Sequence, residues 1–488
     1  MSALGAAIKP TPYGRGLRDL ITIFLGWKLL LLAIACASPG PGYDTSTQIL
    51  LDQHASGDET WLARLLERVI LRLTRWDGIY FASASTHGHV NEQEWAFSWV
   101  LAKVTSGVAR VVFSPASFSP LVKHALAGVL ISHVSHLLAV TVLYRLALNV
   151  VPGTDATRRH VAFIASCLHI ISPAGIFLSA PYGESTFAFL NFAGMLSYIL
   201  AVRQRHSNSH RSTSNGISYV LAAGAFFGAA ATIRSNGLLS GLIFAWDAIE
   251  AFIRPLNTMR DARSMARFSA TILAGMLVAV GFAAPQVVAY TEYCTGGNTR
   301  PWCSHIPPSI YTWVQGHYWG VGFLRYWTLN NLPLFLLAGP VLGLLLVTGL
   351  MALRWPERTA LAPTQQQGRN MKVMDTEVVK HVLPRFALPQ LVLALMAATS
   401  FHVQIINRIS SGYPSCYIVL AIAIHSALQP SRGGDSGARD NMSQVPVGTE
   451  SLWPLNIWDE KHCRWIVRGM VMYALVQGGL YASFLPPA

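Results

Sequence analysis

The sequence predicts an all-α polytopic membrane protein. Only 12% of its 488 residues are charged, compared with about 25% in soluble domains, and 52% are hydrophobic. Mean hydropathy is +0.39, and apolar runs of about 17–25 residues recur along the chain. This small number of charged residues cannot cover the water-facing surface of a soluble protein of this size. We therefore predict membrane-spanning helices that form one domain over residues 1–488.

Eleven apolar runs are long enough to be predicted as spanning helices. They lie near residues 17–38, 120–148, 159–179, 183–202, 217–233, 236–253, 268–290, 331–353, 384–405, 411–429 and 465–486. The first run contains Lys28 and ends in small residues that resemble a signal-peptide cleavage site. Its length favours an uncleaved first helix.

The basic residues predict a cytosolic N-terminus. With that orientation, 22 of the 36 Lys and Arg residues fall in cytosolic segments and ten on the opposite side. Residues 354–383 and 430–464 are then polar cytosolic stretches that we predict to be flexible loops. The net charge of +13 follows this topology, and without zinc-ligand spacing or RNA-binding aromatic motifs we expect no nucleic-acid partner.

Two large segments, residues 39–119 and 291–330, lie on the non-cytosolic side. In the first, leucines and other apolar residues recur at helical spacing over residues 62–73, which predicts an amphipathic helix in the membrane interface. It would hold Asp77, within the sequence RWDGIYF, just above the bilayer. Asp77 is either a general base towards a membrane-presented substrate, or it caps the next helix or pairs with Arg75.

Further polar residues follow on the same side. Glu92, Gln93 and Glu94 lie beside aromatic residues, as in sugar sites, although a solvated loop has the same composition. Glu184, in the turn PYGES between two apolar helices, is either functional or a cap for the next helix. The RSNG sequence, with Arg234 and Asn236, fits a phosphate ligand or an arginine that reaches the interface.

Residues 300–333 interleave basic and aromatic residues, which fits either an interfacial aromatic belt or a site for a lipid-linked phosphate and its sugar. The candidates here and after the next predicted spanning helix are Arg300, Trp319, Arg325, His402, Gln404 and Arg408. Cys294 and Cys303 share this polar segment; a disulfide between them requires an oxidising compartment, and the sequence leaves their pairing open.

These motifs together resemble the GPI mannosyltransferase 2 family. The matching sequences, in the family's order, are RWDGIYF (75–81), EQEWAF (92–97), PYGES (181–185), RSNG (234–237), YWGVGFLRYWTLNNLP (318–333) and HVQ (402–404). The resemblance covers residues 75–410 and points to fungal members. It implies a GT-C type fold in the endoplasmic-reticulum membrane, with about eleven spanning helices, a large first luminal loop and a luminal active site.

The resemblance also implies a reaction. The donor is dolichyl-phosphate-mannose, and the acceptor is the mannosyl-glucosaminyl-(acyl)phosphatidylinositol precursor, which receives its second mannose in an α-1,6 linkage with inversion. Asp77 is then the expected general base, with Glu92 positioning the acceptor or sharing the role. The expected substrate-binding residues are Trp76, Gln93, Glu94, Glu184, Arg234, Asn236, Arg300, Trp319, Arg325, His402, Gln404 and Arg408. We expect no metal and no cofactor, while the family suggests a small membrane partner subunit.

Two other classes fit parts of the sequence. A lipid or solute transporter would place ionisable residues at mid-membrane on paired broken helices, whereas here they gather at one interface. A non-catalytic subunit of a membrane complex would not need Asp77. The mannosyltransferase interpretation accounts for more of the motifs.

Overall fold

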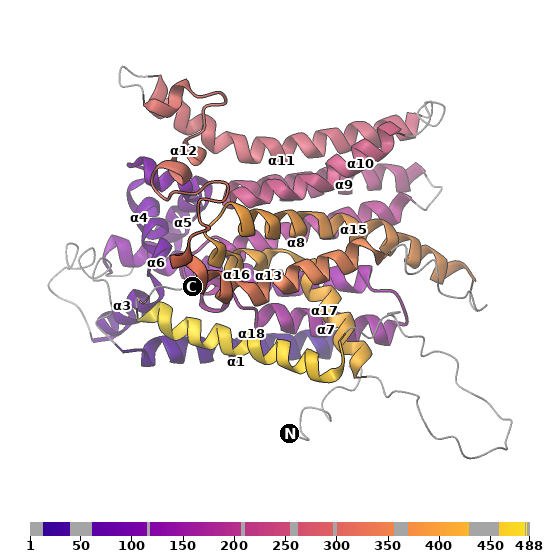
Figure 1. Cartoon of the computed structure of the whole chain (residues 1–488), viewed down its shortest axis with the longest axis horizontal. Coiled ribbons are helices and arrows are strands. Elements are labelled where there is room, and N and C mark those ends of the chain that lie inside the picture. The colour runs from indigo at the N-terminus through magenta and orange to yellow at the C-terminus, as the bar shows by residue number, and fades with distance from the viewer. Residues whose placement is uncertain are drawn as a thin grey trace, which may run out of the picture.

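The computed structural model is a bundle of helices, most of which run side by side (Figure 1). It describes residues 13–39, 61–114, 118–205, 210–253, 262–295, 300–355, 369–428, 458–483 and 485. None of these residues forms a β-strand. The predicted all-α membrane architecture is confirmed.

The α-helices are α1 Tyr13–Ala37, α3 Trp61–Leu73, α4 Asp77–His87, α5 Trp99–Val112, α6 Pro120–Val150, α7 Asp155–Ile170, α8 Glu184–Arg205, α9 His210–Ile233, α10 Leu242–Ile253, α11 Ala262–Cys294, α12 Ile310–His317, α13 Leu332–Leu353, α15 Arg369–Thr399, α16 Ile406–Ile409, α17 Pro414–Ala427 and α18 Glu460–Ala482. Short 3-10 helices connect them: η1 Glu92–Ala96, η2 Gly175–Leu178, η3 Ser235–Gly241, η5 Pro301–Ser304, η6 Leu329–Asn331, η7 Val403–Ile405 and η8 Ser410–Gly412.

Eight helical segments in the described residues are long and apolar enough to cross a membrane: α1, α6, α8, α9, η3 with α10, α11, α13 with η6, and α15. Three other predicted spans also contain helices. Of these, α7 and α17 have 16 and 14 residues, and α18 has 23 residues with charged residues in its first turns. The number of eleven spans stays a prediction.

The predicted loop over residues 354–383 is wrong in its second half, because α15 begins at Arg369. The apolar run predicted as the next spanning helix begins near residue 384. In the structure Pro384 lies inside α15, and the preceding Val378 and Val382 are fully buried in the core. Tertiary packing of these apolar residues stabilises the helix ahead of the proline.

The other predicted cytosolic loop, residues 430–464, falls largely outside the described residues. Its last residues are helical, because α18 starts at Glu460. Asp459 caps this start by accepting a hydrogen bond from the backbone N–H of His462 at 2.8 Å.

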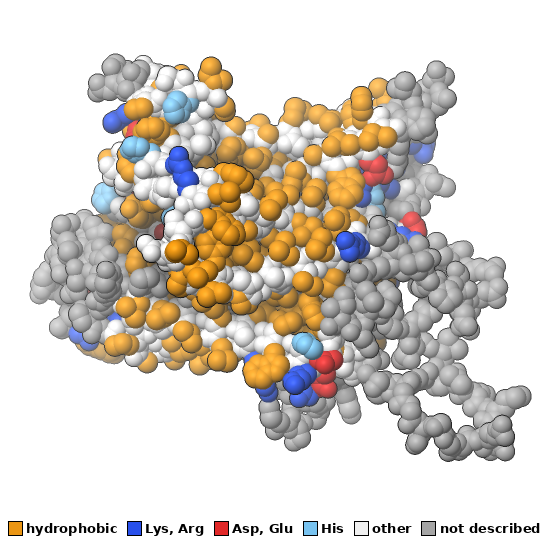
Figure 2. Space-filling model, in the orientation of Figure 1, with side chains coloured by type: hydrophobic (Ala, Val, Ile, Leu, Met, Phe, Trp, Pro, Cys, Tyr) orange, Lys and Arg blue, Asp and Glu red, His pale blue; other side chains and the backbone are white. Residues whose placement is uncertain are grey.

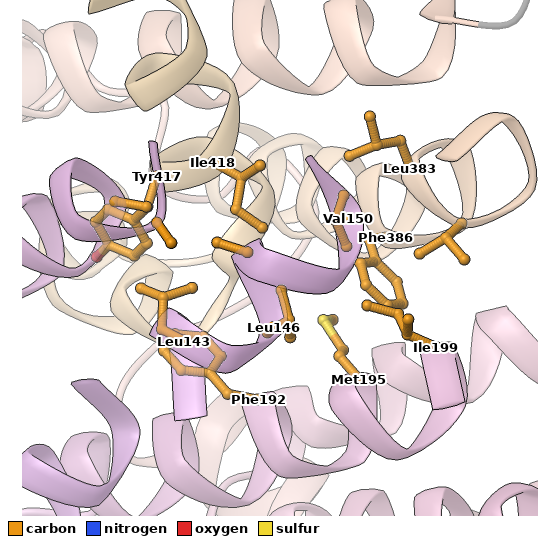
Figure 3. Packing of buried hydrophobic residues seen from close by; sticks show 14 of the residues in the cluster. Leu143, Leu146, Val150, Phe192, Met195, Ile199, Leu383, Phe386, Tyr417 and Ile418 are labelled. Carbon is orange, nitrogen blue, oxygen red and sulfur yellow. The ribbon is translucent and has the colours of Figure 1, made fainter. Parts of the chain in front are cut away.

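The main core lies between α6, α8, α15 and α17. Figure 3 shows its side chains converging from these four helices. They are Leu143, Leu146 and Val150 of α6, Phe192, Met195 and Ile199 of α8, Leu383 and Phe386 of α15, and Tyr417 and Ile418 of α17. This core fixes α8 and α17 relative to each other, and a second buried cluster packs Ile406 and Ile409 of α16 with Phe187 of α8. The candidate site described below includes the first residue of α8 and Arg408 of α16.

Helices α9 and α11 pack through small residues. A Cβ on Gly281 would lie 2.1 Å from the backbone oxygen of Gly228, so only glycine allows this backbone approach. Close contact through small residues is how helices associate where surrounding lipid removes the hydrophobic driving force. The pair carries Arg234, which follows the last residue of α9, to the same end of the bundle as α4.

A buried ion-pair cluster lies near the junction of α8, α10 and α15. Asp247 accepts hydrogen bonds from Arg385 at 2.6 Å and from Tyr198 at 2.8 Å, and lies 3.3 Å from Arg205. The cluster satisfies the charge of Asp247 inside the protein, as a buried carboxylate requires. It ties α8, α10 and α15 together.

One end of the bundle is formed by α3, α4, α5, α12 and α16, at the left in Figure 1, and is called the α4 end here. Figure 2 shows hydrophobic side chains over the middle of the visible face and charged side chains mainly towards its ends. This distribution fits a protein whose middle lies in hydrocarbon. The residues that the sequence placed on the non-cytosolic side lie at the α4 end.

Candidate functional site

Four charged residues meet at the α4 end. Arg408, in α16, donates from Nη2 to Oδ2 of Asp77, the first residue of α4, at 2.5 Å. Its Nε lies 3.6 Å from Oε1 of Glu184, the first residue of α8. The same oxygen accepts a hydrogen bond from Nη1 of Arg234 at 2.7 Å. These four residues form a continuous charge network assembled from segments more than 300 positions apart in the sequence.

The charge network is formally neutral and only partly accessible. The side chain of Glu184 is fully buried and that of Arg408 is 15% exposed, whereas Asp77 keeps 33% of its side chain exposed. Burial opposes the charge of Arg408, but attraction by Asp77 and Glu184 outweighs it and raises the pKa of Arg408, so the guanidinium remains a cation. Asp77 is the network carboxylate that a substrate can reach.

Glu184 has a second oxygen with unused hydrogen-bonding capacity. Its Oε2 is buried and accepts no hydrogen bond from any described residue. A buried carboxylate is normally satisfied on both oxygens. The two arginines beside Oε1 therefore balance the negative charge of Glu184, while Oε2 can still accept a hydrogen bond.

The backbone before Asp77 is held by two tyrosines. The hydroxyls of Tyr182 and Tyr481 each donate to the backbone oxygen of Arg75, at 3.0 and 3.1 Å. The intervening Trp76 has a positive φ of 52°, an unusual conformation for a residue with a side chain. Gly78, which follows Asp77, is so close to Tyr182 that an added Cβ would lie 3.1 Å from its ring. Asp77 is thus presented on a constrained turn.

Aromatic rings cover the guanidinium of Arg408. Its central carbon lies 5.3 Å from the ring centre of Phe177 and 5.4 Å from that of Tyr182. Cations are attracted to aromatic faces, and the flat guanidinium stacks well on them. Both rings come from the segment between α7 and α8, which leads directly into Glu184 at the start of α8, so this segment helps to set where Arg408 lies.

Glu92 belongs to a different set of contacts. Its carboxylate accepts hydrogen bonds from Trp302, Trp313 and Tyr318 at 3.2, 3.3 and 3.1 Å. Arg300 adds an ion pair at 3.6 Å. All four partners lie in residues 300–318, so Glu92 joins the first non-cytosolic segment to the second. The structure does not bring Glu92 into the charge network of Asp77.

This arrangement predicts a mainly structural effect of Glu92→Gln. The amide loses the charge and one acceptor oxygen, and hydrogen bonds to charged groups contribute about 1.5–3 kcal/mol each. Residues 300–318 should become more accessible to protease in membranes, and turnover should fall about tenfold. The exposed Glu292→Gln is the matched control. If Glu92 were instead the general base, turnover would fall about 10²- to 10⁴-fold without a change in protease sensitivity.

Two neighbouring predicted residues stabilise local structure. Glu94 accepts hydrogen bonds from the backbone N–H groups of Val90 and Asn91, at 2.6 and 2.8 Å, and so caps η1. Gln93 lies half-buried in the same 3-10 helix. The capping interaction uses the side chain of Glu94 and leaves that of Gln93 available to a substrate.

The predicted residues of the second segment and η7 form a group of their own. His402 bonds through Nε2 to the backbone oxygen of Trp319 at 2.9 Å and stacks on Tyr326. Gln404, in η7, has a buried Oε1 that accepts no hydrogen bond within the described chain. Arg325 is exposed and makes no ion pair with any residue that the structure describes. Arg325 is therefore the predicted phosphate ligand least occupied by protein carboxylates.

Two further predictions concern Asn236 and the cysteines. Asn236 and Tyr413 exchange hydrogen bonds at 2.9 and 3.2 Å, which fixes the turn after α9 beside η8. Cys294 and Cys303 form a disulfide, with their Cα atoms 5.7 Å apart. The bond links the end of α11 to η5 and so supports the adjacent Trp302, which binds Glu92.

Sequence reasoning missed Tyr481 and the site role of Tyr182. Tyr182 lies within the PYGES motif, so its position beside Glu184 was a usable signal. Tyr481 lies in the last helix, more than 400 residues from Arg75, and nothing in its neighbouring sequence indicates this contact. Only the packing of α18 against α3 and η2 reveals it.

The fold and the charge network define an integral membrane protein with a polar site at one end of its helical bundle. The sequence profile of the family described as Mannosyltransferase (PIG-V) matches residues 17–488. The chain therefore belongs to this mannosyltransferase family and is a glycosyltransferase. The predicted resemblance is confirmed.

Relatives from fungi are similar over nearly the whole chain. A protein named GPI mannosyltransferase 2 from Aspergillus oryzae is 39% identical over 97% of this chain and 96% of its own length. Proteins of the same name from Chaetomium globosum and Gibberella zeae are 40% and 39% identical, over 99% and 97% of this chain and 98% of their own lengths.

Solved structures show weaker similarity. An oligosaccharyltransferase from Archaeoglobus fulgidus, tethered to an acceptor peptide, is 14% identical with a TM-score of 0.44, over 96% of this chain and 56% of that chain. ArnT from Cupriavidus metallidurans, bound to undecaprenyl phosphate, is 12% identical with a TM-score of 0.36, over 90% of this chain and 76% of that chain.

Proposed function

We propose that this chain adds the second mannose of the GPI-anchor precursor. It would transfer mannose from dolichyl-phosphate-mannose, in an α-1,6 linkage, to the mannosyl-glucosaminyl-(acyl)phosphatidylinositol acceptor at the luminal face of the endoplasmic reticulum. The names of the fungal relatives support the substrate. The observation that carries the mechanism is the partly exposed Asp77 held by Arg408 at the end of a membrane bundle.

Asp77 is the proposed general base. A base works when it lies within hydrogen-bond reach of the proton it removes and stays ionised beforehand. Arg408 donates a hydrogen bond to Oδ2 of Asp77 and orients it, and 33% of the Asp77 side chain stays exposed for an acceptor hydroxyl to approach. The acceptor hydroxyl gives its proton to Asp77, its oxygen bonds to the anomeric carbon of mannose, and the bond from that carbon to the phosphate oxygen breaks. Dolichyl phosphate leaves with one more negative charge.

Inversion follows from a single displacement. The donor linkage is β and the product α, so one attack opposite the leaving phosphate suffices and no covalent enzyme intermediate forms. Arg325 and Arg300 are proposed to receive the phosphate, because Arg325 is exposed and the side chain of Arg300 is 51% exposed. Arg234 and Arg408 also pair with carboxylates, but their side chains are only 19% and 15% exposed, and they are proposed to stabilise the base instead.

We propose that the remaining predicted residues either bind the sugars or stabilise the structure of the site. Gln93, Trp319 and Gln404 present a polar or flat surface at the α4 end and are proposed to bind sugar rings or hydroxyls. We propose that Trp76, Glu94, Glu184, Asn236 and His402 hold the site in shape through the contacts described above. A GT-C type fold, residues 39–119 and 291–330 as luminal segments, and a small partner subunit remain predictions.

The orientation is proposed to be N-terminus cytosolic and α4 end luminal. The Cys294–Cys303 disulfide supports this assignment, since disulfides persist in the oxidising lumen and are rare in the cytosol.

Glycosylation mapping tests this orientation. The sequence contains a single acceptor for N-glycosylation, Asn441-Met442-Ser443, in the segment assigned to the cytosol. It should remain unmodified when the protein is expressed in cells, whereas an acceptor introduced near residue 45 should be glycosylated. Endoglycosidase-sensitive shifts on gels give the readout. Modification of Asn441 with an unmodified residue-45 acceptor would reverse the topology.

A further inference from the structure

A buried lysine in the first helix contacts the segment that leads into Glu184 of the candidate site. Lys28 lies in the candidate span Gly16–Ala37 and is only 6% exposed. Its Nζ donates to the backbone oxygen of Leu178 and to Oγ of Ser179, both at 2.8 Å. It also lies 5.4 Å from the ring centre of Phe24. Lys28 makes no ion pair with any carboxylate of the described residues.

A charged group inside a membrane span is unfavourable unless it has a specific role. The mannosyl-transfer mechanism does not use Lys28 directly, and the network of Asp77 does not include it. Its hydrogen bonds therefore indicate what it does. Both acceptors are at the end of η2, where the chain turns towards α8.

Side chains from two helices donate hydrogen bonds to the backbone oxygen of Leu178. It accepts one hydrogen bond from Lys28 of α1 and another from Oγ of Ser185 of α8, at 3.0 Å. Ser185 directly follows Glu184 of the charge network. Lys28 thus ties α1 to the start of α8 through one backbone oxygen.

The same short segment carries the aromatic rings that hold Arg408. Phe177 directly precedes Leu178, and Tyr182 follows three residues after Ser179. Their rings lie 5.3 and 5.4 Å from the guanidinium of Arg408. A shift of this segment would move Arg408, and Asp77 would move with it because their side chains are bonded at 2.5 Å.

We propose that Lys28 is a positioning residue for mannosyl transfer: its ammonium group fixes the 177–185 segment, and that segment sets the geometry of Arg408 and Asp77. This role presupposes the proposed reaction. Lys28 touches no substrate and takes no part in proton transfer. It should therefore affect turnover more than substrate binding, since a misplacement of about 1 Å can lower a rate about 10²-fold.

The test compares three variants in microsomes from cells that lack the second mannosyltransferase. Lys28→Met keeps the length but removes the donors and the charge, and Lys28→Arg keeps both. Leu29→Met is the matched control, because Leu29 is the next residue of α1 and is 66% exposed on the outer side. Rates are measured with dolichyl-phosphate-mannose and the acceptor lipid, normalised to the amount of protein.

We expect kcat to fall about 10- to 100-fold in Lys28→Met, with both KM values within about twofold of wild type. Lys28→Arg should recover part of the rate, and Leu29→Met should match wild type. Wild-type kcat in Lys28→Met, or a loss confined to KM, would overturn the positioning role. A wild-type chain without transfer activity would instead refute the proposed function, so the two failures are distinguishable.

If Lys28→Met does not accumulate, Lys28→Arg and Ser179→Ala are compared singly and together. Residues that act through one contact show non-additive effects. We then expect the double variant to lose no more kcat than the more impaired single variant. Additive losses would show that Lys28 and Ser179 act separately and would contradict the role.

Discussion

Asp77→Asn should reduce mannosyl transfer about 10²- to 10⁴-fold while the protein still accumulates and spans the membrane. The range is the usual contribution of a positioned general base. Asparagine has nearly the same shape and keeps an acceptor for Arg408, so the contact of α4 with α16 is retained. It cannot take the proton of the acceptor hydroxyl. The loss should therefore appear in kcat, with little change in donor KM.

A matched control separates lost chemistry from lost folding. Asp459→Asn makes the same substitution at an exposed helix cap, where asparagine caps equally well, and should leave activity unchanged. Asp77→Glu keeps a carboxylate and should retain more activity than Asp77→Asn. In cells lacking the endogenous enzyme, the readout is GPI-anchored protein at the surface at matched expression. Normal surface levels with Asp77→Asn would show that Asp77 is not the base.

Arg408→Gln should have the largest effect on stability. Arg408 bridges Asp77 and the fully buried Glu184. Removing one partner of a buried ion pair leaves uncompensated charge and destabilises proteins by about 3–5 kcal/mol. We expect a clearly lower melting temperature in detergent, reduced accumulation and loss of transfer, because Asp77 also loses the group that orients it.

A double variant distinguishes lost charge balance from lost packing. Asp77→Asn combined with Arg408→Gln removes one negative and one positive charge, so the remaining pair of Glu184 and Arg234 is balanced. Its melting temperature should exceed that of Arg408→Gln alone. Arg325→Gln, which removes an exposed arginine without an ion pair in the described chain, is the control for stability. Equal melting temperatures for the single Arg408 variant and wild type would contradict the network.

Much of the site could be predicted because its residues lie in short local motifs on one side of the membrane. Loop charges placed Asp77, Glu184, Arg234 and Arg408 on the same face, and the structure brings these four together. Their pairing could not be predicted, because any of the non-cytosolic arginines could have reached a given carboxylate. That choice depends on how α8, α9 and α16 pack.

Glu92 illustrates a limit of reading composition. A carboxylate beside aromatic residues suggested a sugar site, but its four partners come from residues 300–318. The indole N–H groups of Trp302 and Trp313 need acceptors when buried, and Glu92 supplies them. The sequence contains both halves of this contact, but gives no sign that they meet.

Fold predictions succeeded where hydrophobicity decides and failed where packing overrides local signals. The apolar runs identified the helices of the bundle, whereas the start predicted near residue 384 is wrong, because α15 begins at Arg369. Lys28 was visible as an exception within the first apolar run. Its hydrogen bonds to Leu178 and Ser179 depend on tertiary packing, because 150 and 151 positions separate these residues from Lys28 in the sequence.

The most direct test of the proposed function is product analysis with the wild-type chain. Microsomes from cells lacking the second mannosyltransferase, but expressing this chain, are given labelled dolichyl-phosphate-mannose and the mannosyl-glucosaminyl-(acyl)phosphatidylinositol acceptor. One labelled mannose should be added, and it should be released by an α-1,6-specific mannosidase. No transfer at normal expression, or a product with a β or non-1,6 linkage, would contradict the proposed inverting α-1,6 transfer.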